Sequence, residues 1–318
     1  MTGNIDLWEI PFTKNNILFI GWRQWADAGS VSSGLPRYLI DQEKARQIGK
    51  LSDSGYYIFQ LPGTHDLFRP IIRYEDGHPT ALETQLNEIY FHGNENTGIT
   101  YFIGDEPHIN VEHYCQSILD IAKQLNIHRI IGFGGVYGEV PFTKERLISS
   151  TYSLPRLKVE VEGLNVNLSD YQGGASIGSY LCRRAGESDF EYISFYAFIP
   201  SYNFNFLGEA GKSIRIENDF YAWLGILKRV NHLYKLSLDL SDLEIRSAQL
   251  KDAFEAKIDE IDRENPELGV KSYLKNLAEN FEEISFNPTD NFWEEKLRGL
   301  FDRINDDDLP VEPPSHQP

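Results

Sequence analysis

Two short apolar segments on either side of an amphipathic stretch constrain this chain most. Residues 99–103 and 129–133 are apolar runs followed by glycine, and residues 111–125 between them carry apolar side chains at helical spacing. Strand, helix and strand in this order form a βαβ unit, whose two strands are parallel and whose crossover is right-handed. The second strand runs into a loop containing Gly134, Gly135 and Gly138, where the backbone can approach another backbone or a ligand closely. We therefore expect a parallel sheet around this unit.

The same alternation of apolar runs and helical stretches covers most of the chain. Nearly continuous apolar runs are typical of strands that are covered on both faces. We expect one mostly parallel sheet with helices on both faces, and further strands in it at residues 17–22, 56–60 and 191–199. Asp76-Gly77 predicts a hairpin turn between Ile-Ile-Arg-Tyr at 71–74 and the residues that follow.

The C-terminal third shows helical periodicity alone. Ser241 and Glu244 match a capping box, in which a hydroxyl and a carboxylate bind the free backbone donors of a helix start. We expect an α/β domain over residues 1–236 and a helical appendage over residues 237–305. The acidic, proline-rich residues 306–318 have too little apolar surface to fold, which predicts a disordered tail.

The composition of the chain argues against several classes of binding partner. The net charge of −18 argues against nucleic acid, which requires a basic surface, and against an anionic membrane surface. No apolar run is long enough to span a membrane, and no basic segment precedes an apolar one at the N-terminus, so we expect a cytoplasmic protein. Cys115 and Cys182 lie in apolar helical patterns, which favours buried thiols, and the eight histidines show no metal-ligand spacing.

Several short motifs, in order along the chain, resemble those of the PAC2 family, the proteasome assembly chaperone 2-like proteins. They are Gly-Trp-Arg-Gln-Trp-Ala-Asp-Ala-Gly at 21–29, Arg-Pro at 69–70, Gly-Asp-Glu-Pro at 104–107, the Gly-Gly…Val-Pro-Phe-Thr segment at 134–143 and Tyr-Gln-Gly…Gly at 171–178. One position departs from the family pattern. Phe142 stands where the family commonly has histidine, so a function that rests on that histidine does not transfer to this chain.

The resemblance implies a three-layer α/β/α fold similar to nucleoside phosphorylases and peptide hydrolases. It also implies a protein that forms homo-oligomers and acts on other proteins, since the best-known members are assembly chaperones of the proteasome α-ring.

Loops that follow parallel strands meet at the carboxyl edge of a sheet, where ligands bind in open α/β folds. Carboxylates from several such loops beside a histidine could act as acid and base or hold a cation. They could instead cap helices or pair with Arg23, Arg69 or Arg73, and we favour this second interpretation. We accordingly assign no catalytic residue, metal or cofactor. The candidate pocket residues at this edge are Trp25, Asp27, Glu106, His108, Tyr137, Glu139, Gly173 and Gly174.

Two further segments have both a structural and a functional interpretation. The glycines from Gly173 to Gly178 could hold a phosphate at a helix N-terminus, but they lack the Lys-Ser/Thr of a P-loop, and close helix packing or a subunit contact is favoured. The aromatic residues 196–206 suit a core or an interface. We expect this segment and the helix near Gly178 to be partly buried between identical subunits.

These observations favour a non-enzymatic, homo-oligomeric protein of the PAC2 type that binds a protein partner. The alternative is an enzyme with a nucleotide or phosphate pocket at the carboxyl ends of the strands.

Overall fold

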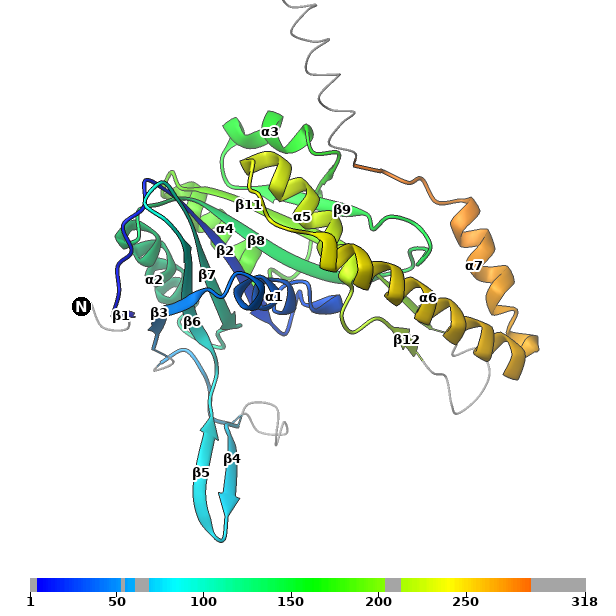
Figure 1. The fold of residues 1–318 in the computed structure, drawn as a ribbon, viewed down its shortest axis with the longest axis horizontal. Coiled ribbons are helices and arrows are strands. Elements are labelled where there is room, and N and C mark those ends of the chain that lie inside the picture. Colours follow the sequence, from blue (N-terminus) through cyan, green and yellow to red (C-terminus); the bar gives the residue numbers. More distant parts are fainter. Residues whose placement is uncertain (1–4, 53–54, 61–68, 204–212, 287–318) are drawn as a thin grey trace, which may run out of the picture.

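The computed structural model describes residues 5–52, 55–60, 69–203 and 213–286. They form a ten-stranded sheet with helices on both faces and a separate two-stranded hairpin (Figure 1). From one edge of the sheet to the other, the strands are β1 (Ile5–Leu7), β3 (Arg46–Leu51), β6 (Asn87–Gly93), β7 (Thr97–Asp105), β2 (Asn15–Arg23), β8 (Ile127–Gly138), β11 (Glu191–Asn203), β9 (Ile148–Tyr152) and β10 (Asn167–Leu168), and β12 (Ser213–Arg215) pairs with β11.

The centre of the sheet is parallel and its flanks are mostly antiparallel. β7, β2, β8 and β11 run parallel to one another, whereas β1, β3 and β6 on one side and β9 on the other join in antiparallel register. The predicted α/β sheet is confirmed, and its four central strands are four of the five predicted ones. The strand predicted at residues 56–60 is wrong. Tyr56 and Tyr57 there turn their hydroxyls to His113 and Asn87, and the segment lies outside the sheet.

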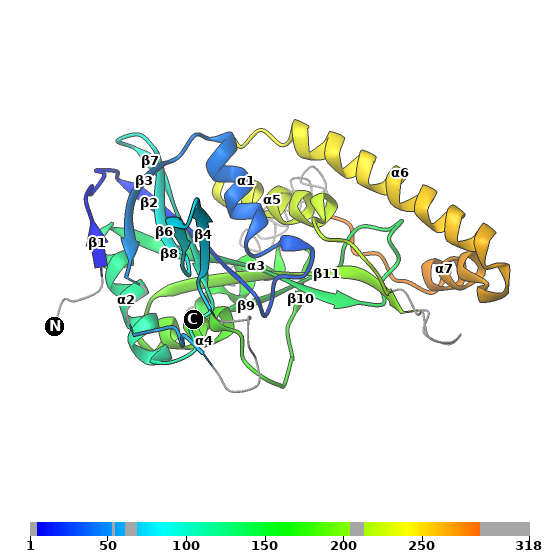
Figure 2. The same cartoon turned by 90° about the horizontal axis from the view of Figure 1, so that it is seen from below.

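Alternating side chains of the central strands fill two separate cores, as the two-residue period of a strand requires. Phe19 of β2 belongs to one core, with helices α1, α5 and α6, and Leu18 belongs to the other, with α2 and α4. Figure 2 shows the resulting three layers. The helices are α1 (Gly34–Gln42), α2 (Val111–Gln124), α3 (Lys158–Glu162), α4 (Ile177–Glu187), α5 (Phe220–Tyr234), α6 (Ser241–Glu264) and α7 (Val270–Glu279), with single 3-10 turns at Ala28–Ser30, Pro155–Leu157 and Pro266–Leu268.

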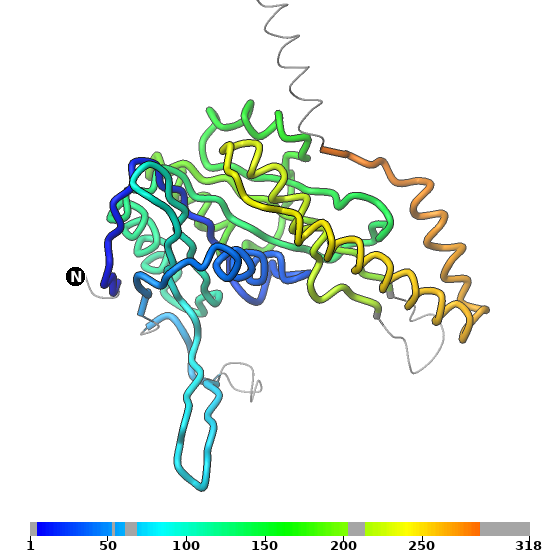
Figure 3. Tube along the Cα trace, viewed as in Figure 1, coloured from blue at the N-terminus to red at the C-terminus, as the bar shows by residue number. Residues whose placement is uncertain are grey.

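The hairpin consists of β4 (Ile71–Glu75) and β5 (His78–Glu83). Asp76 and Gly77 both adopt positive φ, 48° and 80°, as the predicted tight turn requires, so this prediction is confirmed. The hairpin projects from the body of the molecule as a free arm (Figure 3). We call it the arm below.

The start of α6 differs from the predicted capping box. The Ser241 hydroxyl does not accept a bond from the helix; it donates to the carboxylate of Asp239, at 2.7 Å, and the same carboxylate accepts the Ser241 N–H. The prediction was wrong because a nearer carboxylate takes the serine hydroxyl as its donor. Leu243, Phe254 and Ile258 of α6 belong to the same core as α5. The domain division at residue 236 stays a prediction, and the tail at 306–318 lies outside the described residues.

Candidate functional site

Glu106 lies at the centre of the carboxyl edge and caps a helix. It follows β7, and its Oε1 accepts the N–H of Ile177, the first residue of α4, at 2.7 Å. The N–H of Trp25, which follows β2, is a second donor to the same side chain. A carboxylate is favourable at a helix N-terminus because the exposed N–H groups carry partial positive charge. Burial nevertheless raises the pKa of Glu106 above its ordinary value, against the lowering effect of these two bonds.

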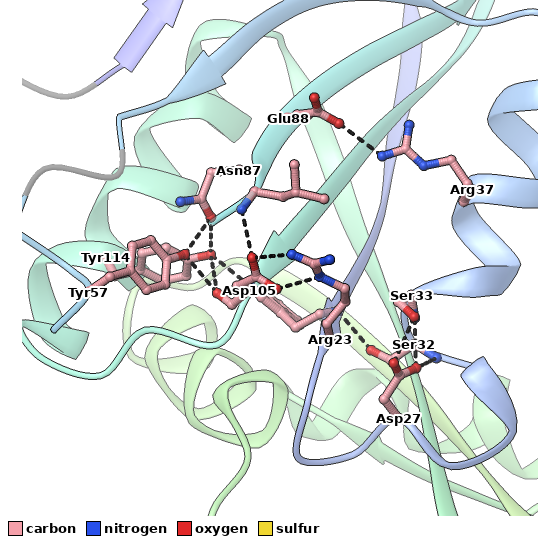
Figure 4. A network of polar contacts seen from close by, with 12 residues as sticks. Arg23, Asp27, Ser32, Ser33, Arg37, Tyr57, Asn87, Glu88, Asp105 and Tyr114 are labelled. Atoms are coloured by element: carbon pink, nitrogen blue, oxygen red, sulfur yellow. Dashed lines mark hydrogen bonds and ion pairs between the residues drawn. The ribbon is translucent and has the colours of Figure 1, made fainter. Parts of the chain in front are cut away.

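Asp27 is also engaged by backbone donors. Its Oδ1 accepts the N–H groups of Ser32 and Ser33, at 3.0 and 2.9 Å, and its Oδ2 accepts the Ser33 hydroxyl at 2.7 Å (Figure 4). These bonds hold the turn that leads into α1. Burial raises the pKa of Asp27 and outweighs the lowering effect of the serine donors. The loop rests directly on β8, since a side chain at Gly135 would collide with the carbonyl of Ala28.

A third carboxylate at this edge, Asp105, is paired. Its two oxygens accept Nε and Nη2 of Arg23, each at 2.6 Å, and Oδ2 also accepts the N–H of Leu86 (Figure 4). This bidentate pair joins the ends of β2 and β7, and it leaves the carboxylate only 3% exposed.

The structure brings some of the candidate residues together and separates others. Trp25 and Glu106 line one cavity at the N-terminus of α4, and the Trp25 ring lies beside Gly174. Gly173 lies under the ring of Tyr171. His108 lies apart, and its Nδ1 accepts the N–H of Ile58 at 3.1 Å.

Tyr137 and Glu139, at the end of β8, have other neighbours. The guanidinium of Arg215 lies 5.1 Å from the Tyr137 ring, and Glu139 bonds the hydroxyl of Tyr273 in α7. Tyr137 therefore faces β12, and Glu139 faces the C-terminal helix α7.

The cavity beside Glu106 has a volume of about 10 Å³, which is room for about one water molecule. Its polar lining includes Glu106, Ser176 directly before α4, and three residues of β11 that point to the same side, Tyr192, Ser194 and Tyr196. Sequence reasoning did not assign these residues to the site. The available signal was a hydroxyl at three alternate positions, 192, 194 and 196, of a largely apolar strand.

Two classes of feature are absent from the part of the chain that the structure describes. No group of three or more His, Cys, Asp or Glu side chains is placed to hold a metal ion. None of the helices there combines the length and the apolar character needed to cross a membrane.

The sequence model of the PAC2 family matches residues 22–258, about three quarters of the chain. The chain belongs to the PAC2 family. Similar solved structures include a proteasome-assembly chaperone homologue from Mycobacterium tuberculosis, 18% identical over 76% of this chain and 94% of that chain, with a TM-score of 0.64. They also include a PAC2 family protein from Streptomyces avermitilis, at 19% identity, 79% and 99% coverage and a TM-score of 0.64.

An archaeal proteasome activator from Pyrococcus furiosus is more distant, at 17% identity, 79% and 97% coverage and a TM-score of 0.57. At these identities the likeness establishes a shared fold. A comparison with curated proteins found no match.

One pH effect follows from the PAC2 fold at this edge. Burial lowers the pKa of His108 below its ordinary value of 6.5, and protonation at Nδ1 would break the bond from Ile58. A lowered folded pKa means that the unfolded chain binds the proton first. Stability is therefore complete above about pH 6.5 and falls as the pH drops from there toward the folded pKa.

We expect the variant His108→Asn to lose this part of the pH dependence, because the amide oxygen can accept the same N–H without titrating. His128, whose pKa burial also lowers, supplies a remaining part in both proteins. The measurement is denaturant unfolding of wild type and variant at pH 7.5 and 5.5. Equal losses of stability in the two proteins would show that His108 does not contribute.

Proposed function

We propose that this PAC2 protein is a non-enzymatic, homo-oligomeric protein that binds a protein partner in a chaperone-like role. The observation that carries the proposal is the arm, whose apolar side chains are exposed. The names of two structural relatives, a proteasome-assembly chaperone homologue and a proteasome activator, support the same class of role. The partner is a protein of unassigned identity.

The arm has one apolar face. Ile72 lies opposite Leu82, and Tyr74 lies two residues along the same face. The three side chains are 47%, 62% and 60% exposed. The other face carries the ion pair of Arg73 and Glu83, beside the exposed Ile71. A two-stranded hairpin with one uncovered apolar face is marginal in water, so a protein surface is the expected cover.

A second copy of the chain is the favoured cover. A stable contact buries about 800 Å² on each partner, and one buried aromatic side chain supplies about 150–250 Å² of that. A single arm, with one tyrosine and a few aliphatic side chains, stays below this area. In a closed homo-oligomer each copy gives one arm and receives another, which doubles the area per copy.

The interface expected from the sequence, at residues 196–206 and the helix near Gly178, stays a prediction. Residues 196–203 lie in β11, between β8 and β9, and Ala197, Ile199 and Tyr202 are fully buried within one chain. Gly178 is likewise enclosed by Trp22, Tyr192 and Tyr196 of its own chain. Tyr196 and Phe198 of β11 remain partly exposed, and residues 204–206 lie outside the described residues.

The enzyme alternative finds less support. Asp27 is bonded to the turn before α1, Glu106 caps α4, and Asp105 is paired with Arg23. The cavity beside Glu106 is also far smaller than the roughly 300–1,000 Å³ of typical small-molecule pockets.

We expect Asp27→Asn and Glu106→Gln each to lower the free energy of unfolding by about 0.5–2 kcal/mol, the cost of a lost helix cap. Protein binding through the arm should be unchanged, because neither side chain belongs to the arm. A thermal-shift screen of wild type and both variants against nucleotides and sugar phosphates is the measurement, and no ligand should stabilise the wild type. A nucleotide or sugar phosphate that raises its melting temperature by several degrees, but not that of either variant, would favour the enzyme.

A further inference from the structure

A fully buried hydroxyl points into the small cavity at the carboxyl edge. Tyr192 of β11 has no exposed surface, and its Oη makes no hydrogen bond to any residue that the structure describes. Space for this hydroxyl comes from Gly132 of β8 and Gly178 of α4, since a side chain at Gly132 would collide with it and one at Gly178 would touch it. A buried polar atom without a partner is costly, so this one calls for an occupant of the cavity.

The same cavity contains a carboxylate without a counter-cation. Glu106 bonds only the N–H groups of Ile177 and Trp25 among the described residues, and no lysine or arginine of that set forms an ion pair with it. The nearest arginine of the lining, Arg23, is already held by Asp105 in a bidentate pair. Burial raises the pKa of Glu106, which a bound cation would lower.

The rim of the cavity is aromatic and strained. Trp25 is 69% exposed although it lines the cavity, and Tyr171, also 69% exposed, reaches the carbonyl of Gly174 beside it. Gln24, directly before Trp25, has φ = 103°, a region that side chains rarely adopt. Strain of this kind persists where the surroundings hold a residue in place, and it is common at ligand sites.

We propose that this cavity binds a primary ammonium group, with its three N–H donors directed to Glu106, to the Tyr192 hydroxyl and to a neighbouring hydroxyl of the lining. An ammonium head is the size of a water molecule and fits the volume, whereas a quaternary ammonium does not. Its alkyl chain leaves past the Trp25 ring. Phosphate is excluded, because Glu106 would repel it. The charge of −18 favours the approach of a cation.

The ammonium can belong to a free small amine or to a lysine side chain of a protein. The inference goes beyond the proposed protein-binding role, because a small amine can occupy the cavity whatever the partner is. The two proposals can fail independently. If no amine binds, the proposed contact through the arm is unaffected, and if the protein is monomeric, the cavity can still bind an amine.

The test is titration of the full-length chain with n-butylammonium, followed by calorimetry and by thermal shift at constant ionic strength. Parallel titrations use Nα-acetyl-lysine methylamide, tetramethylammonium and n-butanol. We expect millimolar binding of n-butylammonium, in line with the binding energy available to so few atoms, and no binding of tetramethylammonium or n-butanol. Binding of the lysine derivative at similar strength would identify a protein side chain as a possible source, and binding of n-butylammonium alone would identify a free amine.

The variants separate this site from a general charge effect. Glu106→Gln should weaken n-butylammonium binding at least tenfold and Tyr192→Phe several-fold, since each removes one acceptor of a charged donor. The matched control is Tyr101→Phe, because Tyr101 is also buried with an unbonded hydroxyl but belongs to the core on the other face of the sheet. The affinity of Tyr101→Phe for n-butylammonium should equal that of the wild type. Absence of binding, equal binding of tetramethylammonium, or equal affinities in all variants would overturn the proposal and leave a single water as the occupant.

Discussion

Replacing Arg146 by methionine is expected to lower the free energy of unfolding by about 3–5 kcal/mol, the cost of leaving a buried charge without its partner. The partner is Asp219, whose side chain is 0% exposed and accepts Nε of Arg146 at 2.7 Å. The same carboxylate accepts the N–H of Ala222 and so caps α5. Arg146 in turn donates to the carbonyls of Phe142 and Lys144, which fixes the loop after β8.

Denaturant unfolding of Arg146→Met is the measurement, and the double variant Arg146→Met/Asp219→Asn should recover part of the loss. Asparagine keeps the cap and removes the unpaired charge. The matched control is Arg73→Met in the arm, where the pair with Glu83 is 66% and 49% exposed and should contribute about 0–1 kcal/mol. A loss in Arg146→Met no larger than in this control would contradict the assigned role of the buried pair.

The Arg146–Asp219 pair illustrates what the sequence could not predict. The two residues are separated by 73 positions and come from different elements, so no local pattern joins them. The central strands were predictable, because β2, β7, β8 and β11 are long apolar runs. The flanking strand β3 was missed, since Arg46, Gln47 and Lys50 make it too polar to stand out.

The candidate site likewise has features that the sequence could predict and features that it could not. Its position at the carboxyl edge followed from the parallel strands. A capping role for Glu106 was one of the two interpretations of the sequence, but the expected helix was the next one in the chain, whereas Glu106 caps α4, 71 residues away. The contribution of β11 was missed, because tyrosines in a buried strand are typical of cores as well as of sites. Only the packing of Gly132 and Gly178 around Tyr192 shows that this tyrosine belongs to the site and is not an ordinary core residue.

Substitutions on the apolar face of the arm are expected to have a second large effect, on self-association. The double variant Ile72→Lys/Leu82→Glu is expected to weaken self-association at least about hundredfold, because it replaces two apolar contacts at the centre of the proposed interface by charges. The two positions lie directly opposite each other, so the new charges form a cross-strand pair and keep the hairpin. The matched control exchanges Arg73 and Glu83 on the other face, which preserves their ion pair and should leave association unchanged.

Light scattering at micromolar concentration measures the molar mass in solution and so shows whether the arm joins copies of the chain. We expect a defined multiple of the chain mass of 36.5 kDa for the wild type and for the Arg73→Glu/Glu83→Arg control, and 36.5 kDa for Ile72→Lys/Leu82→Glu. A wild type that is strictly monomeric, or a double variant that keeps the mass of the wild type, would contradict this expectation.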